Sequence, residues 1–478
     1  MFSAKTKIVA TMGPAIENED MIEALILEGV DVFRINASHG NNEQRKQYIS
    51  TIRKVAEKLN NPVAILLDLQ GPKIRVGEFD SPLILEKGQI FKIMRKEVKG
   101  DSEKCSVSYP EIVDEMGIGM KMMINDGLII LEVKEKESDC LVTEVVVGGE
   151  ISSHKGLNIP DANLDSIPAL TDKDLVDLKF GLENEVDYIA ISFVRNSTDI
   201  DLLRWEIKKI TKDNSAVPYI IAKIEKPQAV KNIDSILDKV EGIMVARGDL
   251  GVEIDITQIP GVQRTLINKA NSKGKIVITA TQMLDSMTYH YTPTRAEVTD
   301  VANALLDGTD AVMLSGETSV GKYPVHTVKV MNDILLHTEE DIRKNGHIYR
   351  SKPLKDIKSN TESALAQSVS LITRELDIKA VACFTNSGYT SRLLSKVRPN
   401  APIIAYCLDD RIKRKLNLIW GTFAKVIERP KNFDKLVSRI MEDLIKNEGF
   451  KKGDNIIIVS GVPISNTKQM NTIKITKL

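Results

Sequence analysis

Short hydrophobic segments of six to eight residues recur along the first two thirds of the chain, and each runs into polar or charged residues. Helix-like stretches separate them, which is the pattern of a parallel α/β fold. Eight such segments precede residue 320, namely KIVATM (7–12), DVFRIN (31–36), AILLDL (64–69), DYIAIS (187–192), YIIAKIE (219–225), GIMVARGD (242–249), KIVITATQ (275–282) and AVMLSGE (311–317). Eight βα units predict a (β/α)8 barrel, the TIM barrel fold.

One interval between these segments is much longer than the others. The segment starts are separated by no more than 36 residues, except that 64 and 187 lie 123 residues apart. Within that interval the pattern changes to short strands and turns, without a long amphipathic helix. We therefore expect a catalytic barrel formed by residues 1–71 and 169–345. Residues 72–168 would form an inserted small β-barrel domain that acts as a lid.

Two helix starts and a third domain complete the predicted organisation. Thr171 precedes an apolar-periodic run, and Thr294 with Glu297 forms a T-x-x-E capping box. After the polar stretch 347–360, residues 355–478 are predicted to form a C-terminal α/β domain. Its expected strands are AVACFT, PIIAYC, AKVIER and NIIIVSG.

Composition and charge exclude several classes of protein. The 478 residues are 42% apolar and 27% charged, as in ordinary globular proteins of about three domains. A net charge of −1 offers no basic field for nucleic acid or a membrane surface, so we expect neither as a partner. The four cysteines form no CxxC pair, and no signal peptide or membrane-spanning run is visible. We expect a cytoplasmic protein.

Polar side chains gather at the C-terminal ends of the predicted strands, where barrels of this kind carry their catalytic groups. These residues are Arg34, Asn36, Asp68, Lys223, Glu225, Arg247, Asp249, Thr281 and Glu317. Lys223 and Glu225 are two apart in a strand, so their side chains point the same way. A salt bridge that closes the barrel end is the commoner fate of a lone pair. Arg34 and Asp249 on the same rim favour a functional site instead.

Glu225 and Asp249 are the predicted ligands of a divalent metal ion. Two carboxylates, together with water and a substrate oxyanion, suit Mg²⁺ or Mn²⁺. The sequence has no histidine cluster of the kind that binds zinc or non-haem iron. His39 lies near the site, where a loop hydrogen bond is as plausible as catalysis. The glycine in MVARGDLG leaves backbone N–H groups for an anion, or is simply a turn glycine.

Nine segments resemble the pyruvate kinase family, in order along essentially the whole chain. They are TKIVATMGPA, DVFRINASHG, LLDLQGPKIRVG, SHKGLNIP, IIAKIEKPQAV, GIMVARGDLGVEI, TATQMLDSM, YTPTRAEVTDVANALLDGTDAVMLSGETSVGKYP and TNSGYTSR. The resemblance implies a barrel with an inserted lid and a C-terminal α/β domain. It also implies transfer of the phosphoryl group of phosphoenolpyruvate to ADP, giving pyruvate and ATP in the last step of glycolysis.

The resemblance also implies roles for individual residues. Lys223 would stabilise the phosphoryl group in transfer, Arg34 would contact it, and Thr281 would lie beside the enolate carbon that is protonated. Such chemistry needs positioning and charge neutralisation more than covalent catalysis. The implied substrate-binding residues are Arg34, Lys223, Ala246, Arg247, Gly248, Asp249 and Thr281, of which Ala246, Arg247 and Gly248 would present their backbone to the carboxylate.

The nucleotide would lie on another side of the same mouth. Asn36, Ser38 and His39 would line its site, and Arg75 and Lys155 would reach the ADP phosphates from the lid. Closure of the lid would exclude water, which competes as a phosphoryl acceptor.

A monovalent cation site follows from the same resemblance. Many pyruvate kinases need K⁺, in a pocket that corresponds here to Asn36, Ser38, Asp68 and the carbonyl of Leu69. The combination of Leu69, Gln70 and Lys73 resembles the branch that works without K⁺. The Lys73 ammonium would replace the cation beside substrate phosphate and Asp68, whereas a surface loop lysine is the alternative. We predict that K⁺ is not required.

A second candidate site lies in the C-terminal domain, which the resemblance makes a regulatory domain of a homotetramer. Residues of TNSGYTSR would hold the phosphate of an allosteric effector, namely Thr385, Asn386, Ser387, Gly388 and Thr390. A solvated turn capped by Ser387 is the alternative. The later loop SGVPISNT lacks a Trp-Arg pair found in some relatives. A monophosphorylated sugar or AMP is therefore as plausible an effector as fructose 1,6-bisphosphate.

Two other functions stay open. Metal-dependent aldolases and phosphoenolpyruvate mutases also use barrels with Glu, Asp and Arg at the strand ends. They would not account for Arg75 and Lys155 on the lid or for the third domain. A non-catalytic metabolite sensor would require a missing catalytic group, and the sequence lacks none.

Overall fold

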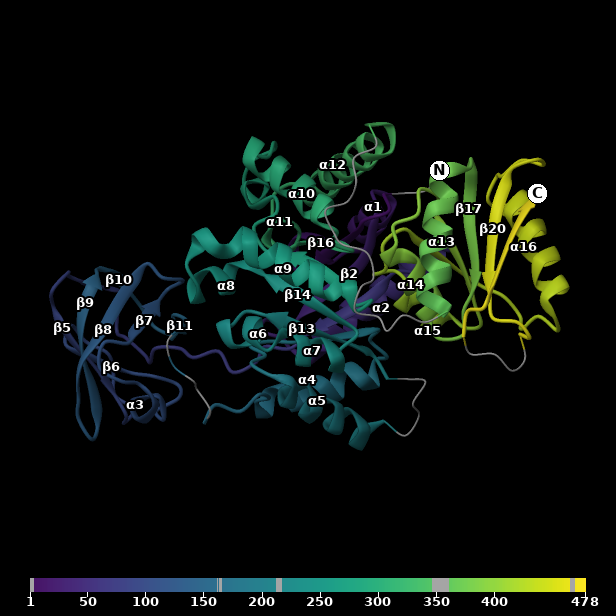
Figure 1. The fold of residues 1–478 in the computed structure, drawn as a ribbon. Coiled ribbons are helices and arrows are strands. Elements are labelled where there is room, and N and C mark those ends of the chain that lie inside the picture. The colour runs from purple at the N-terminus through teal and green to yellow at the C-terminus, as the bar shows by residue number, and fades with distance from the viewer. Residues whose placement is uncertain (1–3, 161, 163–165, 212–216, 346–360, 465–468) are drawn as a thin grey trace.

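The protein consists of three parts in a row, with a closed barrel between a β-sheet lid and an α/β domain (Figure 1). The computed structural model describes residues 4–160, 162, 166–211, 217–345, 361–464 and 469–478. Eight parallel strands close the barrel, and they are β1 (Lys7–Thr11), β2 (Val30–Asn36), β3 (Ala64–Asp68), β12 (Tyr188–Ile191), β13 (Tyr219–Ile224), β14 (Gly242–Ala246), β15 (Ile276–Ala280) and β16 (Ala311–Leu314). The prediction of a (β/α)8 barrel is confirmed.

Helices cover the outside of the barrel. They are α1 (Glu19–Leu27), α2 (Asn42–Lys58), α4 (Asp172–Glu183), α5 (Ser197–Ile210), α6 (Pro227–Lys231), α7 (Ile233–Lys239), α8 (Arg247–Glu253), α9 (Ile259–Ser272), α10 (Arg295–Asp307), α11 (Gly316–Ser319) and α12 (Pro324–Asn345). Both predicted helix starts are confirmed, because Thr171 caps α4 and Thr294 caps α10, each in a complete capping box.

Three barrel strands end two or three residues earlier than predicted. β14 stops at Ala246 because Arg247 already begins α8, and β16 stops at Leu314 shortly before α11. β15 stops at Ala280, since Thr281 and Gln282 have φ angles of 65° and 53°. A left-handed backbone cannot continue a strand. The polar residues beyond these ends therefore belong to the loops and short helices of the mouth.

The inserted lid is an all-β unit with one short helix. Where a small β-barrel is predicted, the structure has a six-stranded sheet and a separate two-stranded sheet. Its elements are β4 (Leu83–Leu85), β5 (Ile90–Met94), β6 (Lys104–Ser106), α3 (Ile112–Glu115), β7 (Lys121–Ile124), β8 (Ile129–Lys136), β9 (Cys140–Val147), β10 (Gly149–Ile151) and β11 (Leu157–Asn158). The last of these, β11, is the strand from which the chain returns to the barrel.

The C-terminal part is a five-stranded sheet in the order β19-β18-β17-β20-β21. Its elements are α13 (Thr361–Glu375), β17 (Ile378–Phe384), α14 (Tyr389–Lys396), β18 (Ile403–Cys407), α15 (Asp410–Lys415), β19 (Thr422–Val426), α16 (Phe433–Asn447), β20 (Asn455–Ser460) and β21 (Thr472–Lys477). The antiparallel edge strand β21 was not predicted. The predicted boundary between 345 and 355 and the end of the loop SGVPISNT lie outside the described residues.

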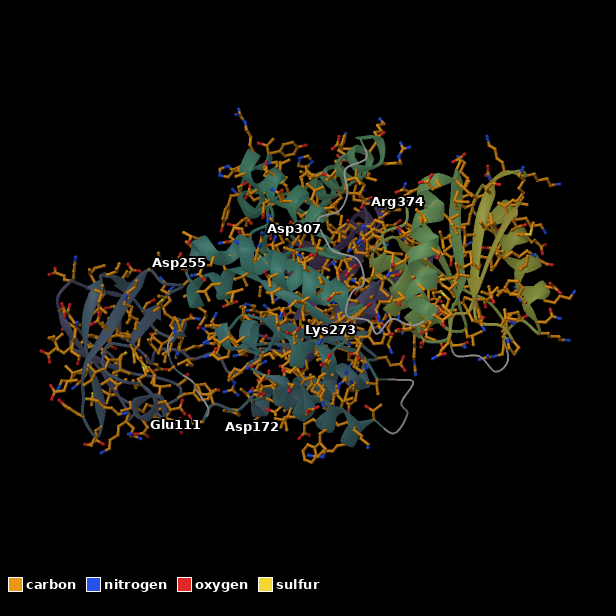
Figure 2. The ribbon with its side chains drawn as sticks, viewed as in Figure 1. Glu111, Asp172, Asp255, Lys273, Asp307 and Arg374 are labelled. Atoms are coloured by element: carbon orange, nitrogen blue, oxygen red, sulfur yellow. The ribbon has the colours of Figure 1, made fainter. Side chains whose placement is uncertain are left out.

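Charged side chains cover all three parts, as at the exposed residues Glu111, Asp172, Asp255 and Arg374 (Figure 2). Within the described part of the chain, no helix has the length and apolar character needed to span a membrane.

A buried ion cluster joins the barrel to the C-terminal part. Asp310, just before β16, pairs with Lys396 and with Arg398 at 3.2 Å, and Lys396 Nζ donates to Asn271 at 2.9 Å. The side chains of Asp310 and Lys396 are fully buried. Asp310 is therefore the carboxylate partner of both cations across the domain interface.

We expect Asp310→Asn to lower the free energy of unfolding by about 3 to 5 kcal/mol, because it leaves two buried cations uncompensated. Urea unfolding followed by the emission of Trp420, whose ring lies 4.5 Å from Arg398, measures this effect. Lys379→Met is the control, since its pair with Asp377 is solvent-exposed and should contribute only about 0 to 1 kcal/mol. Unfolding of Asp310→Asn at the wild-type urea concentration would contradict the role of the cluster.

Candidate active site

Four charged residues from three strands meet at the mouth of the barrel. Lys223 Nζ lies 2.9 Å from Glu225 Oε1 and 3.4 Å from Asp68 Oδ1. Arg34 Nε donates to Asp68 Oδ2 at 2.7 Å. Lys223 also donates to the Ser192 hydroxyl at 2.9 Å, a residue that the sequence did not single out. Two cations and two carboxylates therefore share one buried cluster.

Lys223 and Asp68 keep their charges although they are buried. Burial disfavours the Lys223 ammonium, but Asp68 and Glu225 together raise its pKa above the ordinary value. Burial also opposes ionisation of Asp68, whose pKa is nevertheless lowered by Lys223 and Arg34. For Glu225, burial prevails over Lys223 and raises the pKa, with Asp249 adding to the shift. The lysine is thus a fixed positive charge at neutral pH.

The predicted metal ligands lie close to this cluster. Glu225 Oε2 accepts the Phe193 N–H at 2.7 Å, whereas its Oε1 faces the Lys223 ammonium at 2.9 Å. Asp249, in α8, is partly exposed and lies 3.5 Å from the Lys73 ammonium. The described residues contain no cluster of three or more His, Cys, Asp or Glu side chains that could hold a metal on their own. Two carboxylates with open positions fit Mg²⁺ or Mn²⁺ completed by substrate and water.

Lys73 lies elsewhere than expected. The sequence placed its ammonium beside Asp68, but the structure pairs it with Asp249, while Asp68 is paired with Arg34 and Lys223. The reason is that residues 72–74 already lead toward the lid. The Leu69 carbonyl, predicted to face a monovalent cation, accepts the Ser192 hydroxyl at 2.7 Å.

Arg247 and Thr281 fix the loops after β14 and β15. The Arg247 guanidinium donates to Asp300 at 2.6 and 2.8 Å and to the Thr281 carbonyl at 2.7 Å. The Thr281 hydroxyl accepts the Gly248 N–H at 2.8 Å. Of the backbone groups predicted to face a substrate carboxylate, Gly248 N–H thus already has a partner. Glu317 is buried and accepts the N–H groups of Leu284 and Ser315, so it holds loops together.

A cavity of about 520 Å³ opens beside Arg34. Asn36 and His39 line it, as predicted for the nucleotide site, and Ser38 donates its N–H to Asn36 Oδ1 at 3.1 Å. Gln44 and Tyr48 also line it and were not predicted, because they lie on a helix whose sequence is ordinary. On the lid, Arg75 donates to the His154 carbonyl at 2.8 Å, next to Lys155.

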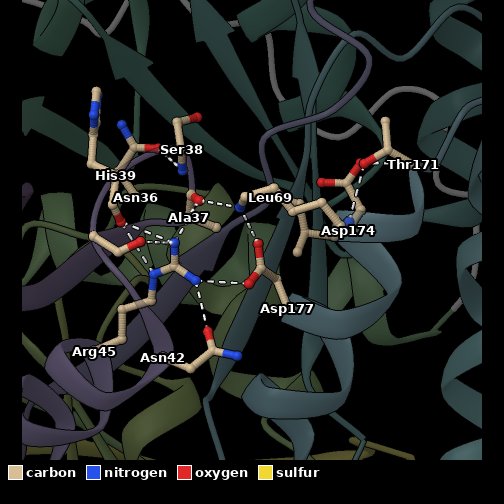
Figure 3. A network of polar contacts seen from close by, with 12 residues as sticks. Asn36, Ala37, Ser38, His39, Asn42, Arg45, Leu69, Thr171, Asp174 and Asp177 are labelled. Atoms are coloured by element: carbon tan, nitrogen blue, oxygen red, sulfur yellow. Dashed lines mark hydrogen bonds and ion pairs between the residues drawn. The ribbon is translucent and has the colours of Figure 1, made fainter.

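The shape of this cavity depends on Arg45 (Figure 3). Its guanidinium donates to Asp177 at 2.7 Å and to the carbonyls of Ala37 and His39 at 2.7 and 2.9 Å. Both Arg45 and Asp177 are buried. One side chain on α2 therefore ties the loop after β2 to α4. No sequence motif indicated this residue.

Comparison with known proteins identifies the family. A family profile described as "Pyruvate kinase, barrel domain" matches residues 3–328, and "Pyruvate kinase, alpha/beta domain" matches residues 363–476. The chain belongs to the pyruvate kinase family. Curated pyruvate kinases from Geobacillus stearothermophilus and Staphylococcus aureus are each 42% identical to it, over 98% of this chain and 80% of their own length. A crystal structure of a pyruvate kinase from Cryptosporidium parvum matches with a TM-score of 0.91 at 35% identity, covering 99% of this chain and 96% of that one.

The candidate effector loop of this pyruvate kinase family member joins β17 to α14. The Thr385 hydroxyl accepts the Gly388 N–H at 2.9 Å, and Thr390 is buried, while Asn386 and Ser387 are exposed. Gly388, with a φ of 82°, is the N-terminal residue flanking α14, and no side chain caps the helix. The alternative in which Ser387 caps the helix is therefore not what the structure shows.

We expect Arg45→Lys to raise the KM for ADP by about tenfold or more, because a lysine cannot make the forked contacts that shape the loop, and small misplacements are costly. Steady-state kinetics with ADP and phosphoenolpyruvate varied separately measure the effect. Lys46→Arg, one residue along the same helix, is the matched control. An unchanged KM for ADP in Arg45→Lys would show that the loop keeps its shape without the hydrogen bonds of the guanidinium.

Proposed function

We propose that this chain transfers the phosphoryl group of phosphoenolpyruvate to ADP, giving pyruvate and ATP, at the mouth of the barrel. The observation that carries the proposal is the buried cluster in which Lys223 stands between Glu225 and Asp68, with Arg34 beside them. Positively charged side chains held at one point would stabilise the phosphoryl group in transfer, because its negative charge spreads over its oxygens.

In this proposal Arg34 and Lys223 bind the phosphoryl group from one side. Lys223 is held by two carboxylates in the absence of substrate, so its positive charge is already in place at the mouth before the group transfers. Arg247, anchored on Asp300, fixes the α8 loop that faces the substrate carboxylate. The Thr281 hydroxyl would lie beside the enolate carbon that is protonated, and the cavity lined by Asn36 and His39 would receive ADP.

Glu225 and Asp249 would hold the divalent ion. Mg²⁺ or Mn²⁺ bound there supplies positive charge to the substrate oxygens and orients them. The Oε1 atom of Glu225 lies 2.9 Å from the Lys223 ammonium, and this oxygen would take the metal ion. The lid residues Arg75 and Lys155 would approach the ADP phosphates when the lid closes.

A coupled assay of pyruvate formation from phosphoenolpyruvate tests the function. Product should require both ADP and Mg²⁺. Consumption of phosphoenolpyruvate without ADP would instead favour the aldolase or mutase class, which shares the barrel and the acidic strand ends. No product in any combination would favour a metabolite sensor.

Lys223→Met should lower kcat by about two to three orders of magnitude or more, because it removes a charge aimed at the transition state. The KM for phosphoenolpyruvate should change little, as expected for a group that acts on the transition state alone. Lys269→Met, which removes an exposed lysine of the outer helix α9, is the control. A Lys223→Met enzyme that retains most of its kcat would remove Lys223 from this role.

The chain is proposed to work without K⁺. The Lys73 ammonium lies 3.5 Å from Asp249, so it adds one positive charge to the mouth that holds the predicted cation pocket of Asn36, Ser38 and Asp68. A lysine this close to a substrate-binding carboxylate supplies one positive charge without an ion.

We therefore expect near-full activity in tetramethylammonium buffer free of K⁺ and Na⁺, and a new K⁺ requirement in Lys73→Glu. Initial rates with and without KCl measure both effects. Strong activation of the unmodified enzyme by K⁺ would mean that the Lys73 charge does not serve the site.

The loop between β17 and α14 is proposed to bind a phosphorylated effector. Its position supports this role, because Tyr219, the first residue of β13, donates its hydroxyl to the Ser387 carbonyl at 2.8 Å. The other end of β13 carries Lys223. A homotetramer and a cytoplasmic location stay predictions.

At least one of a sugar monophosphate, fructose 1,6-bisphosphate or AMP should shift the phosphoenolpyruvate saturation curve. Thr385→Val should weaken the binding of that effector by about tenfold, because the substitution removes a hydroxyl that would contact it. If no phosphorylated metabolite moves the curve, the loop has no regulatory role in this protein.

A further inference from the structure

The buried carboxylate of Glu253 lies at the junction of the lid and the barrel. Glu253 Oε1 accepts the Asn158 amide at 2.7 Å and the Lys226 ammonium at 2.5 Å. All three side chains are buried or nearly so. Glu253 Oε2 has no hydrogen-bond partner within the described part of the chain. A buried, partly unsatisfied carboxylate is costly, so its retention needs a reason.

The three residues come from three segments that matter to the site. Lys226 directly follows Glu225, and Glu253 ends α8 one helical turn after Asp249. Asn158 ends β11, the last strand of the lid. The Glu253 carboxylate thus connects the segment that carries Glu225 with the helix that carries Asp249. It also connects both of them with the lid.

We propose that Glu253 is a positioning residue, which sets the separation of Glu225 and Asp249 through Lys226 and couples it to the lid through Asn158. The inference rests on the proposed assignment of Glu225 and Asp249 as metal ligands. When the lid moves away, Asn158 leaves the carboxylate and Lys226 remains its single partner. The position of the lid and the geometry of the metal site are therefore linked.

The packing around this junction supports the link. A small cavity of about 30 Å³ lies where Lys73, Asn158 and Lys226 meet, with room for about one water. A short distance away, Gln228 of α6 donates to the carbonyl of Ala162, beyond the lid strands, at 3.2 Å. Asn158 therefore links the lid to α8, and the Ala162 carbonyl links the segment after β11 to α6.

The test uses Mn²⁺ alone, titrated into the free enzyme and followed by electron paramagnetic resonance. Glu253→Gln should weaken Mn²⁺ binding by about tenfold, the usual effect of losing a residue that orients metal ligands. Asn158→Ala should weaken Mn²⁺ binding less than Glu253→Gln does. The double variant should bind Mn²⁺ no worse than Glu253→Gln alone, because the lid acts through the Glu253 carboxylate. Hydrogen exchange in the peptide containing β11 should rise equally in both single variants.

Melting temperatures and two further variants separate the possible outcomes. A lower melting temperature in Glu253→Gln with wild-type Mn²⁺ binding would overturn the proposal, as would additive effects in the double variant. If Glu253→Gln does not fold, Asn158→Ala carries the test, since it leaves the Lys226 pair intact. Wild-type Mn²⁺ binding in Glu225→Gln would show instead that the metal assignment is wrong. Lys134→Ala, in a partly exposed ion pair within the lid, should behave as wild type.

Discussion

The Lys223 ammonium between two buried carboxylates is the interaction on which the site depends. A lone lysine at this depth would lose its proton, and either carboxylate alone would gain one. Together, Asp68 and Glu225 keep Lys223 charged, and Arg34 neutralises the excess on Asp68. The barrel makes this possible, because adjacent parallel strands end at one rim and deliver side chains from distant parts of the chain.

Around this cluster, other contacts fix the positions of loops and domains relative to one another. Arg45 shapes the loop beside the nucleotide cavity, and Arg247 fixes the loop after β15. Glu253 connects the lid with the two acidic loops, while Asp310 holds the C-terminal domain to the opposite end of the barrel. Each is a buried or half-buried charge whose oppositely charged partner lies across a boundary between elements. If one partner moves, the other is left as an uncompensated buried charge, so the positions of the two elements are coupled.

The sequence predicted the barrel and brought the right residues to its mouth, because both follow from local pattern. Strand periodicity alone places Lys223 and Glu225 on one side, and strand order places Asp68 and Arg34 near them. Arg45, Ser192 and Glu253 could not be predicted in this way, since their partners lie far away in sequence. The position of Lys73 was wrong for a related reason, because the path of the chain into the lid is set by packing of the two domains. Family resemblance supplied the roles of Thr281 and the lid residues, which no pattern reveals.

A crystal structure of the enzyme with Mn²⁺ and a phosphoenolpyruvate analogue is the most direct test of the account. We predict an anomalous metal peak bridging the Glu225 and Asp249 carboxylates. The Lys223 ammonium should turn from Glu225 toward the phosphate position while Asp68 stays paired with Arg34. A metal bound away from both carboxylates, or Lys223 still paired with Glu225 in the presence of the analogue, would contradict the account.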